Sequence, residues 1–183
     1  MSRITPPDAH SPAPVSKGRV RLPHIAAAKR SGTRLTMLTA YDALTAPLLE
    51  EAGVDMLLVG DSLGNVMLGH SSTLPVTVGD MERANASVAR STSRALIVAD
   101  LPFGSYEDGP AHAFASAARL MKAGAHAVKL EGGAPRAHII RSLVDAGIPV
   151  CAHLGYTPQS ENALGGPRMQ GRGEAGEAMR ADA

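Results

Sequence analysis

Four short apolar runs in the sequence each end in an ionisable residue, and these endings are where chemistry is expected. The runs lead into Asp61, Asp100, Glu131 and His153, and Lys129 lies two positions before Glu131. Helix-like stretches separate the runs, which is the pattern of a parallel α/β sheet. Because the carboxyl ends of parallel strands meet at one edge of the sheet, we expect these side chains to line one pocket.

Asp61 and Asp100 form the first candidate pair. They follow consecutive predicted strands, so adjacent strands would bring both carboxylates within reach of one ion. Mg²⁺ is commonly held by one or two carboxylates, with water and substrate oxygens completing its shell. The alternative is that each aspartate caps the helix after its strand. The occurrence of the two together favours a metal site.

Lys129 and Glu131 form the second pair, and a spacing of two places them on one face of a strand. A lysine inside an apolar strand is costly to bury unless an anion meets it. That anion is either Glu131, in a structural ion pair, or the carboxylate of a substrate. His153 is open to a catalytic role and to that of a hydrogen-bonded core histidine.

Other motifs carry less information. The tetrapeptide Gly60-Asp61-Ser62-Leu63 matches the GDSL esterases, in which the serine is a nucleophile, but the later Asp-x-x-His of that class is absent. No Gly-x-Gly-x-x-Gly follows the first predicted strand. Cys151 is expected to be a small buried hydrophobe. Four histidines lack metal-ligand spacing and are interpreted as surface or helix residues: His70, His112, His126 and His138.

The elements that must position these residues alternate along the chain. Strands are predicted over residues 35–40, 56–60, 95–99, 127–130 and 150–152. Helices are predicted over residues 24–32, 45–52 and 135–146, with two more, one capped by Asp80 and one opened by Asp108-Gly109-Pro110. The latter carries Phe114, Ala117, Ala118 and Met121 at the spacing of one helix face. This alternation predicts five βα units of a barrel, whereas a closed (β/α)₈ barrel usually needs about 250 residues.

Composition narrows the class of protein. The 183 residues have a hydrophobic content of 44% and a formal charge of +1, which indicates one globular domain and gives no reason to expect nucleic acid as a partner. Residues 1–22 are basic and rich in Pro and Ser, so we expect a disordered tail, with residues 23–183 forming the partial barrel. Neither a membrane span nor a signal-peptide core is present, so a cytoplasmic location is expected.

From residue 22 onward the sequence resembles the ketopantoate hydroxymethyltransferase family. The resemblance rests on residues 37–42, 59–64, 72–77, 99–106, 128–133, 153–159 and 170–172. It implies a TIM barrel of the phosphoenolpyruvate mutase/isocitrate lyase type. It also implies transfer of a hydroxymethyl group from 5,10-methylenetetrahydrofolate to 3-methyl-2-oxobutanoate, which gives 2-dehydropantoate for pantothenate and coenzyme A biosynthesis.

The resemblance also implies roles for the site residues. Asp61 and Asp100 would ligate Mg²⁺, Glu131 would reach the ion through water, and the keto acid would chelate it. Lys129 and Ser62 would hold the substrate carboxylate, and His153 would lie beside the substrate. The family assembles into homo-oligomers, so the same is expected of this chain.

Three departures from the family pattern qualify these expectations. Ser71 stands in place of an acidic residue and Pro167 in place of an aromatic one. The sequence also ends before the sixth strand, which carries the family's general-base glutamate. We therefore expect a shortened member with about five of eight βα units, which binds Mg²⁺ and keto acid weakly and turns over poorly. The alternatives are a Mg²⁺-dependent lyase or mutase for another 2-keto acid, and an inactive remnant that assembles with full-length subunits.

Overall fold

The computed structural model describes residues 15–183, and its centre is a single parallel sheet of five strands. The strands follow one another in chain order across the sheet. They are β1 (Met37–Thr39), β2 (Met56–Val59), β3 (Leu96–Asp100), β4 (Ala127–Glu131) and β5 (Val150–His153). The five predicted strands are thereby confirmed, and the sequential parallel order is that of part of a TIM barrel.

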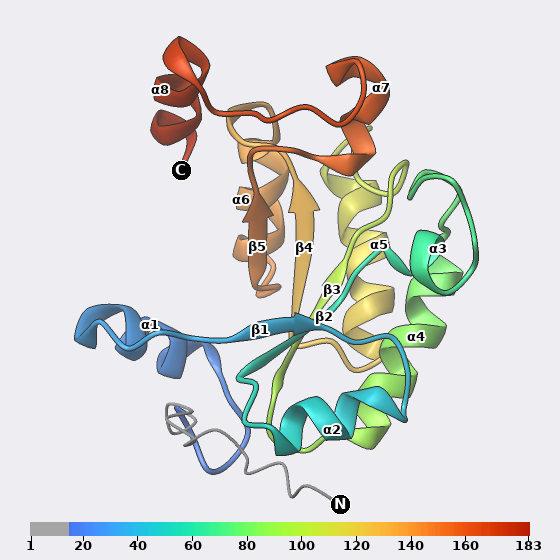
Figure 1. The fold of residues 1–183 in the computed structure, drawn as a ribbon, viewed down its shortest axis with the longest axis vertical. Coiled ribbons are helices and arrows are strands. Elements are labelled where there is room, and N and C mark those ends of the chain that lie inside the picture. The colour runs from blue at the N-terminus through green and yellow to red at the C-terminus, as the bar shows by residue number, and fades with distance from the viewer. Residues whose placement is uncertain (1–14) are drawn as a thin grey trace, which may run out of the picture.

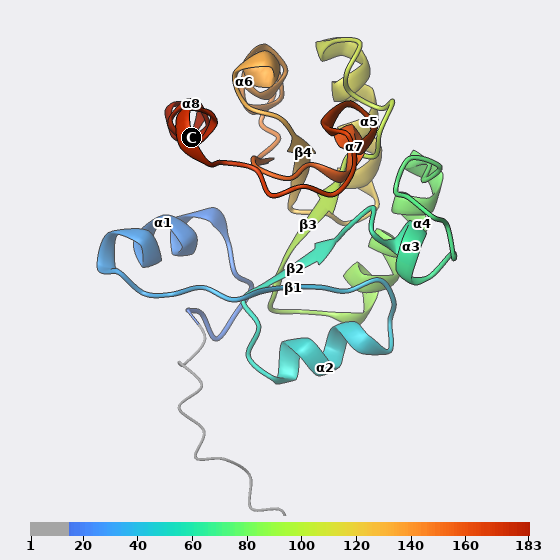
Figure 2. The ribbon, with the colours of Figure 1, turned by 45° about the horizontal axis from the view of Figure 1, so that its top comes forward.

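The helices lie around this sheet (Figures 1 and 2). They are α1 (Leu22–Ser31), α2 (Thr45–Glu51), α3 (Leu63–Val66), α4 (Val78–Ser91), α5 (Pro110–Lys122), α6 (Ala137–Asp145), α7 (Glu161–Leu164) and α8 (Gly173–Asp182), with 3₁₀ turns at Ala134–Arg136 and Pro158–Ser160. In Figure 1, α7 and α8 lie beyond the carboxyl ends of β4 and β5, whereas α1 lies near the opposite ends. Within residues 15–183 no helix is long and apolar enough to cross a membrane.

Both faces of the central strand β3 are apolar, because its alternate residues pack into different clusters. In β3, Ile97 and Ala99 belong to the large core shared with α4, α5 and α6. Leu96 and Val98 face the other side and pack with Val20. Val20 falls in the part of the chain predicted as a tail, yet it is buried and its amide donates to the carbonyl of Arg94 at 2.7 Å. Residues 1–14 of that tail lie outside the described residues.

Two helix predictions were wrong in detail. Thr77, not Asp80, caps α4: the Thr77 hydroxyl accepts from the Asp80 amide, while the Asp80 carboxylate accepts from the Thr77 amide in a capping box. In α5 the buried face is Ala113, Ser116, Ala117 and Leu120, and Phe114 is 46% exposed. Two apolar stripes offset by one residue have the same helical period, so the period alone could not select the packed one.

The prediction that Cys151 is buried was also wrong, because its side chain is exposed. It pairs with Lys129 in the register of β4 and β5, on the face that carries the functional side chains. β5 is the last strand of the sheet and has a single neighbour, β4. A side chain on this face of an edge strand is covered from one side only, which strand propensity cannot reveal.

Glu50, near the end of α2, anchors the turn that leads into β3. Its carboxylate accepts from the backbone amides of Ser93 at 3.0 Å, Arg94 at 2.7 Å and Ala95 at 2.8 Å. Burial raises the pKa of Glu50, but the hydrogen bonds from Ser93, Ala95 and Arg94 outweigh burial and hold the pKa below its usual value. The ionised carboxylate therefore stabilises the fold.

We expect Glu50→Gln to lower the free energy of unfolding at pH 7 by about 1 kcal/mol, allowing for solvent screening of a half-buried group. Because the folded-state pKa is depressed, this stabilisation is present above the unfolded-state pKa and is lost as pH falls through the folded-state value. Urea unfolding at pH 7 and near pH 3 measures both effects. The neighbouring exposed Glu51→Gln is the control, and equal losses in the two variants would contradict the anchoring role.

Candidate active site

A cavity of about 360 Å³ opens at the carboxyl ends of the strands, and we call it the polar pocket. All six residues predicted to form the site contribute to its lining: Asp61, Ser62, Asp100, Lys129, Glu131 and His153. Ser71, which departs from the family pattern, also lines it. The strand register explains the convergence, because Asp100 pairs with Lys129 and Glu131 pairs with His153 across neighbouring strands.

Asp61 and Asp100 lie side by side at the carboxyl ends of β2 and β3. The backbone amide of Asp61 donates to Asp100 Oδ2 at 3.0 Å, and both residues are buried. Burial and the neighbouring Asp100 carboxylate raise the pKa of Asp61 to about 6. Burial also raises the pKa of Asp100. Neither side chain caps a helix, since α3 begins without a side-chain cap and β3 ends at Asp100.

Lys129 pairs across the strands rather than along its own strand. Its Nζ lies 2.7 Å from Asp100 Oδ1 and 4.0 Å from Glu131 Oε1. Burial lowers the pKa of Lys129, but the Asp100 carboxylate more than compensates and the pKa is raised above its usual value. The ammonium is therefore charged, 12% exposed, and located where an anionic ligand of the pocket would meet it.

Glu131 orients His153. The imidazole Nδ1 lies 3.1 Å from Glu131 Oε1, and Glu131 Oε2 accepts from the Gln159 amide at 3.0 Å. A carboxylate accepts hydrogen bonds, so Nδ1 carries a hydrogen and Nε2 is the nitrogen left to exchange a proton. His153 therefore has the arrangement of an oriented general base.

Ser62 is held by Tyr41, which the sequence had not marked as a site residue. The Tyr41 hydroxyl lies 2.9 Å from Ser62 Oγ. Tyr41 follows β1, at the same end of the sheet as the other site residues. The esterase alternative requires Ser62 to bond a histidine base, and its hydrogen-bond partner among residues 15–183 is instead this phenol.

Gln159 is the main site residue that sequence reasoning missed. It is buried in the 3₁₀ turn Pro158–Ser160, and its Nε2 donates to Asp61 Oδ2 at 2.8 Å and to the Leu101 carbonyl at 3.0 Å. Its Oε1 accepts from the buried Tyr106 hydroxyl at 2.6 Å. Tyr106 in turn accepts from the Glu131 amide at 3.1 Å. Gln159 thus links the aspartate pair with Glu131, through its side chain on Asp61 and its backbone amide on the Glu131 carboxylate.

The donor set suits a divalent cation that uses two protein carboxylates. Asp100 Oδ1 is buried and makes no regular hydrogen bond, although Lys129 Nζ is close. A cation would also relieve the repulsion of the buried Asp61 and Asp100 charges. Within the described residues no three His, Cys, Asp or Glu side chains form a metal-binding group. Mg²⁺ commonly keeps waters and substrate oxygens around one or two carboxylates, so the residues present fit it.

Comparison with known sequences shows which protein family the sequence matches. The family model described as ketopantoate hydroxymethyltransferase matches residues 19–183. A 3-methyl-2-oxobutanoate hydroxymethyltransferase of Leifsonia xyli is 54% identical over 176 residues, which cover 96% of this chain and 64% of that protein. The protein of the same name from Thermobifida fusca is 57% identical over 182 residues, covering 96% and 65%. The chain thus spans less than two thirds of these relatives.

Comparison with solved structures confirms the fold. A phosphonopyruvate hydrolase, solved with oxalate and Mg²⁺, matches with a TM-score of 0.56 at 18% identity, over 70% of this chain and 50% of that one. A 2,3-dimethylmalate lyase of the PEP mutase/isocitrate lyase superfamily matches with a TM-score of 0.51 at 18% identity, over 69% and 50%. The predicted barrel fold is therefore confirmed, and the five parallel strands form part of it.

Proposed function

Because the chain belongs to the ketopantoate hydroxymethyltransferase family, we propose that its polar pocket binds 3-methyl-2-oxobutanoate together with Mg²⁺. The reaction would be hydroxymethyl transfer from 5,10-methylenetetrahydrofolate. The observation that carries this proposal is the convergence of a buried aspartate pair with a charged lysine in one cavity. A 2-keto acid offers the matching groups, namely two oxygens for a cation and a carboxylate for an ammonium.

Each residue has a role that follows from its position. Asp61 and Asp100 would hold Mg²⁺, which when bound polarises the keto oxygen of the substrate. Lys129 would pair with the substrate carboxylate, and Ser62, fixed by Tyr41, would donate to it. Glu131 would stay outside the direct ligands, because its oxygens already bind His153 and Gln159.

His153 would accept the proton that leaves C3 of the keto acid, through Nε2. We expect His153→Gln to slow this proton transfer by about 10²-fold, the usual contribution of a general base, while keto-acid affinity stays within about twofold. The measurement combines exchange rates with a binding titration of the same variant. An unchanged rate would exclude His153 as the base.

The proposed function is tested by the first chemical step alone. The 183-residue chain is incubated with 3-methyl-2-oxobutanoate and Mg²⁺ in D₂O, and NMR follows loss of the C3 proton. The expected result is exchange that is slow, requires Mg²⁺ and disappears in Asp61→Ala. A folded chain that neither exchanges this proton nor binds the keto acid would refute the proposal. Exchange without folate-dependent product would favour a lyase or mutase of the same superfamily.

We also propose that the chain works in the cytoplasm as a homo-oligomer. Three leucines near β1 and α2 support an assembly surface, since Leu38, Leu44 and Leu48 are 49%, 78% and 60% exposed. Light scattering of the purified chain measures its mass. A monomer at all concentrations would contradict the oligomeric part of the proposal.

A further inference from the structure

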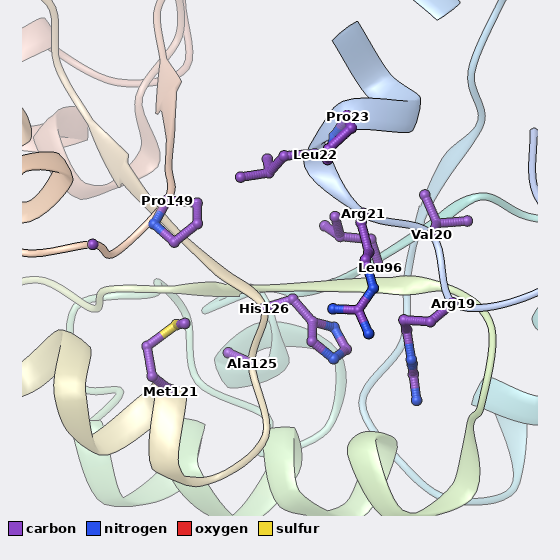
Figure 3. Close-up of a pocket in the computed structure, with 11 residues that line it drawn as sticks. Arg19, Val20, Arg21, Leu22, Pro23, Leu96, Met121, Ala125, His126 and Pro149 are labelled. Atoms are coloured by element: carbon purple, nitrogen blue, oxygen red, sulfur yellow. The ribbon is translucent and has the colours of Figure 1, made fainter. Parts of the chain in front are cut away.

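A second cavity, of about 390 Å³, lies at the amino ends of the strands, and we call it the basal cavity (Figure 3). Its lining comes from the segment entering α1 and the first turn of that helix, from the end of α5, from the amino ends of β3 and β4, and from the loop before β5. Among residues 15–183, none of those that line it is acidic. None of them lines the polar pocket either, so the two cavities are separate.

The polar groups of the basal cavity are all basic. Arg19 donates to the carbonyls of Ala95 at 2.8 Å and Thr92 at 3.1 Å, which fixes its guanidinium without neutralising it. Arg21 forms no ion pair with any residue in the described range 15–183. Figure 3 shows its guanidinium next to the ring of His126. The Glu50 carboxylate, which binds the same turn, partly offsets the charge of Arg19. Within residues 15–183 the charge of Arg21 therefore has no ion-pair partner and is available to a ligand of the cavity.

His126 adds an oriented donor. The Ile97 amide donates to its Nδ1 at 2.9 Å, so the neutral ring carries its hydrogen on Nε2. Burial, together with Arg19 and Arg21, lowers the pKa of His126, which keeps the ring neutral near pH 7. Sequence reasoning set this histidine aside as a surface or helix residue, yet it lies before β4 and lines the cavity.

The remaining walls are apolar. Leu22, Pro23, Met121 and Pro149 lie around the basic groups in Figure 3, and Leu22 is 48% exposed. The first turn of the ten-residue helix α1 begins at Leu22, so its positive dipole end adds to the field of the arginines. A ligand that suits this surface has one anionic end and a short apolar body.

We propose that the basal cavity is a binding site for a small amphipathic anion, with a carboxylate held by Arg21 and His126 and an aliphatic body packed on Leu22, Met121 and Pro149. The volume of about 390 Å³ is within the range of small-molecule sites. This site is independent of the proposed function, because it needs neither Mg²⁺ nor any residue of the polar pocket.

The test is a titration of the folded chain with hexanoate, followed by NMR of the Met121 methyl group and the His126 ring. We expect saturable shifts at both positions. Two control ligands should bind at least about tenfold more weakly than hexanoate. They are acetate, which lacks the aliphatic body, and 1-hexanol, which lacks the negative charge. Arg21→Gln should weaken hexanoate binding at least about tenfold. Lys29→Gln, in the last turn of the same helix, is the matched control and should change it less than twofold.

Three results would overturn this site. One is the absence of saturable shifts at Met121 and His126 in a folded chain. Another is hexanoate affinity that Arg21→Gln leaves unchanged, since the charge would then play no part. The third is a set of shifts at His153 in place of His126, which would locate the carboxylate in the polar pocket. Because Asp61→Asn removes a residue of the polar pocket only, it should leave hexanoate binding at the basal cavity unchanged.

Discussion

In metal-free protein, we expect Asp61→Asn to raise the free energy of unfolding, by about 1–3 kcal/mol at pH 8. Asp61 is 4% exposed and lies beside Asp100, so its charge is opposed both by burial and by a like charge. Since the folded-state pKa of Asp61 is raised to about 6, ionisation destabilises the fold as pH rises through that value. An asparagine keeps the acceptor for Gln159 Nε2 and removes the charge.

Asp100→Asn should have the opposite effect and lower the free energy of unfolding by about 1–3 kcal/mol. Removal of the Asp100 carboxylate also removes the cost of burying its charge, which is the reason that burial raises the pKa of Asp100. That relief is outweighed by the loss of the partner that lies 2.7 Å from the Lys129 ammonium. The next carboxylate oxygen, on Glu131, is 4.0 Å from this ammonium and cannot replace it without movement.

Both variants should nevertheless lose Mg²⁺ affinity, by at least about 100-fold, because each removes a carboxylate that a divalent ion needs. Urea unfolding with EDTA gives the two stabilities, and calorimetric titration with Mg²⁺ gives the affinities. Opposite stability changes with a shared loss of Mg²⁺ binding identify a metal site with one ion-paired and one unpaired carboxylate. If both variants bind Mg²⁺ like the unaltered chain, the pair is not a metal site.

The sequence predicted the strands well because buried parallel strands are short, continuous apolar runs. Each observed strand differs from its prediction by one or two residues at one or both ends, and β3, β4 and β5 extend to include Asp100, Glu131 and His153. The spacing of Lys129 and Glu131 correctly gave one shared face. It could not give the true partner of Lys129, since that contact depends on the register between two strands.

The contribution of Gln159 could not be read from the sequence, because it comes from a short 3₁₀ turn without periodicity. The residue is 98 positions from Asp61 along the chain, and loop geometry alone brings them together. The motif covering residues 153–159 contained it, but an amide in a loop carries no chemical signal by itself. The structure shows its importance, because four hydrogen bonds converge on one buried residue.

We also expect a large effect from Gln159→Met, outside the aspartate pair. Methionine keeps the volume but removes the amide, so the Tyr106 hydroxyl loses an acceptor and Asp61 loses a donor. The Tyr106 hydroxyl keeps only the more distant Glu131 carbonyl, at 3.3 Å. Weakening the hydrogen bonds of these buried groups should cost about 2–4 kcal/mol of stability in total. Mg²⁺ affinity should fall by about 10–100-fold, as is usual when a residue that orients a ligand is lost. Urea unfolding and calorimetric Mg²⁺ titration measure the two losses.

Tyr106→Phe separates the orienting role of Gln159 from general destabilisation. It removes the hydroxyl that bonds Gln159 Oε1 and the Glu131 amide, so it also destabilises the fold. Gln159 would still be fixed by the Leu101 carbonyl and could still donate to Asp61. We therefore expect Mg²⁺ affinity within about threefold of the unaltered chain. Equal losses of Mg²⁺ affinity in the two variants would show that the role of Gln159 is only to stabilise the fold. A loss confined to Gln159→Met means that the Gln159 amide sets the orientation of the Asp61 carboxylate.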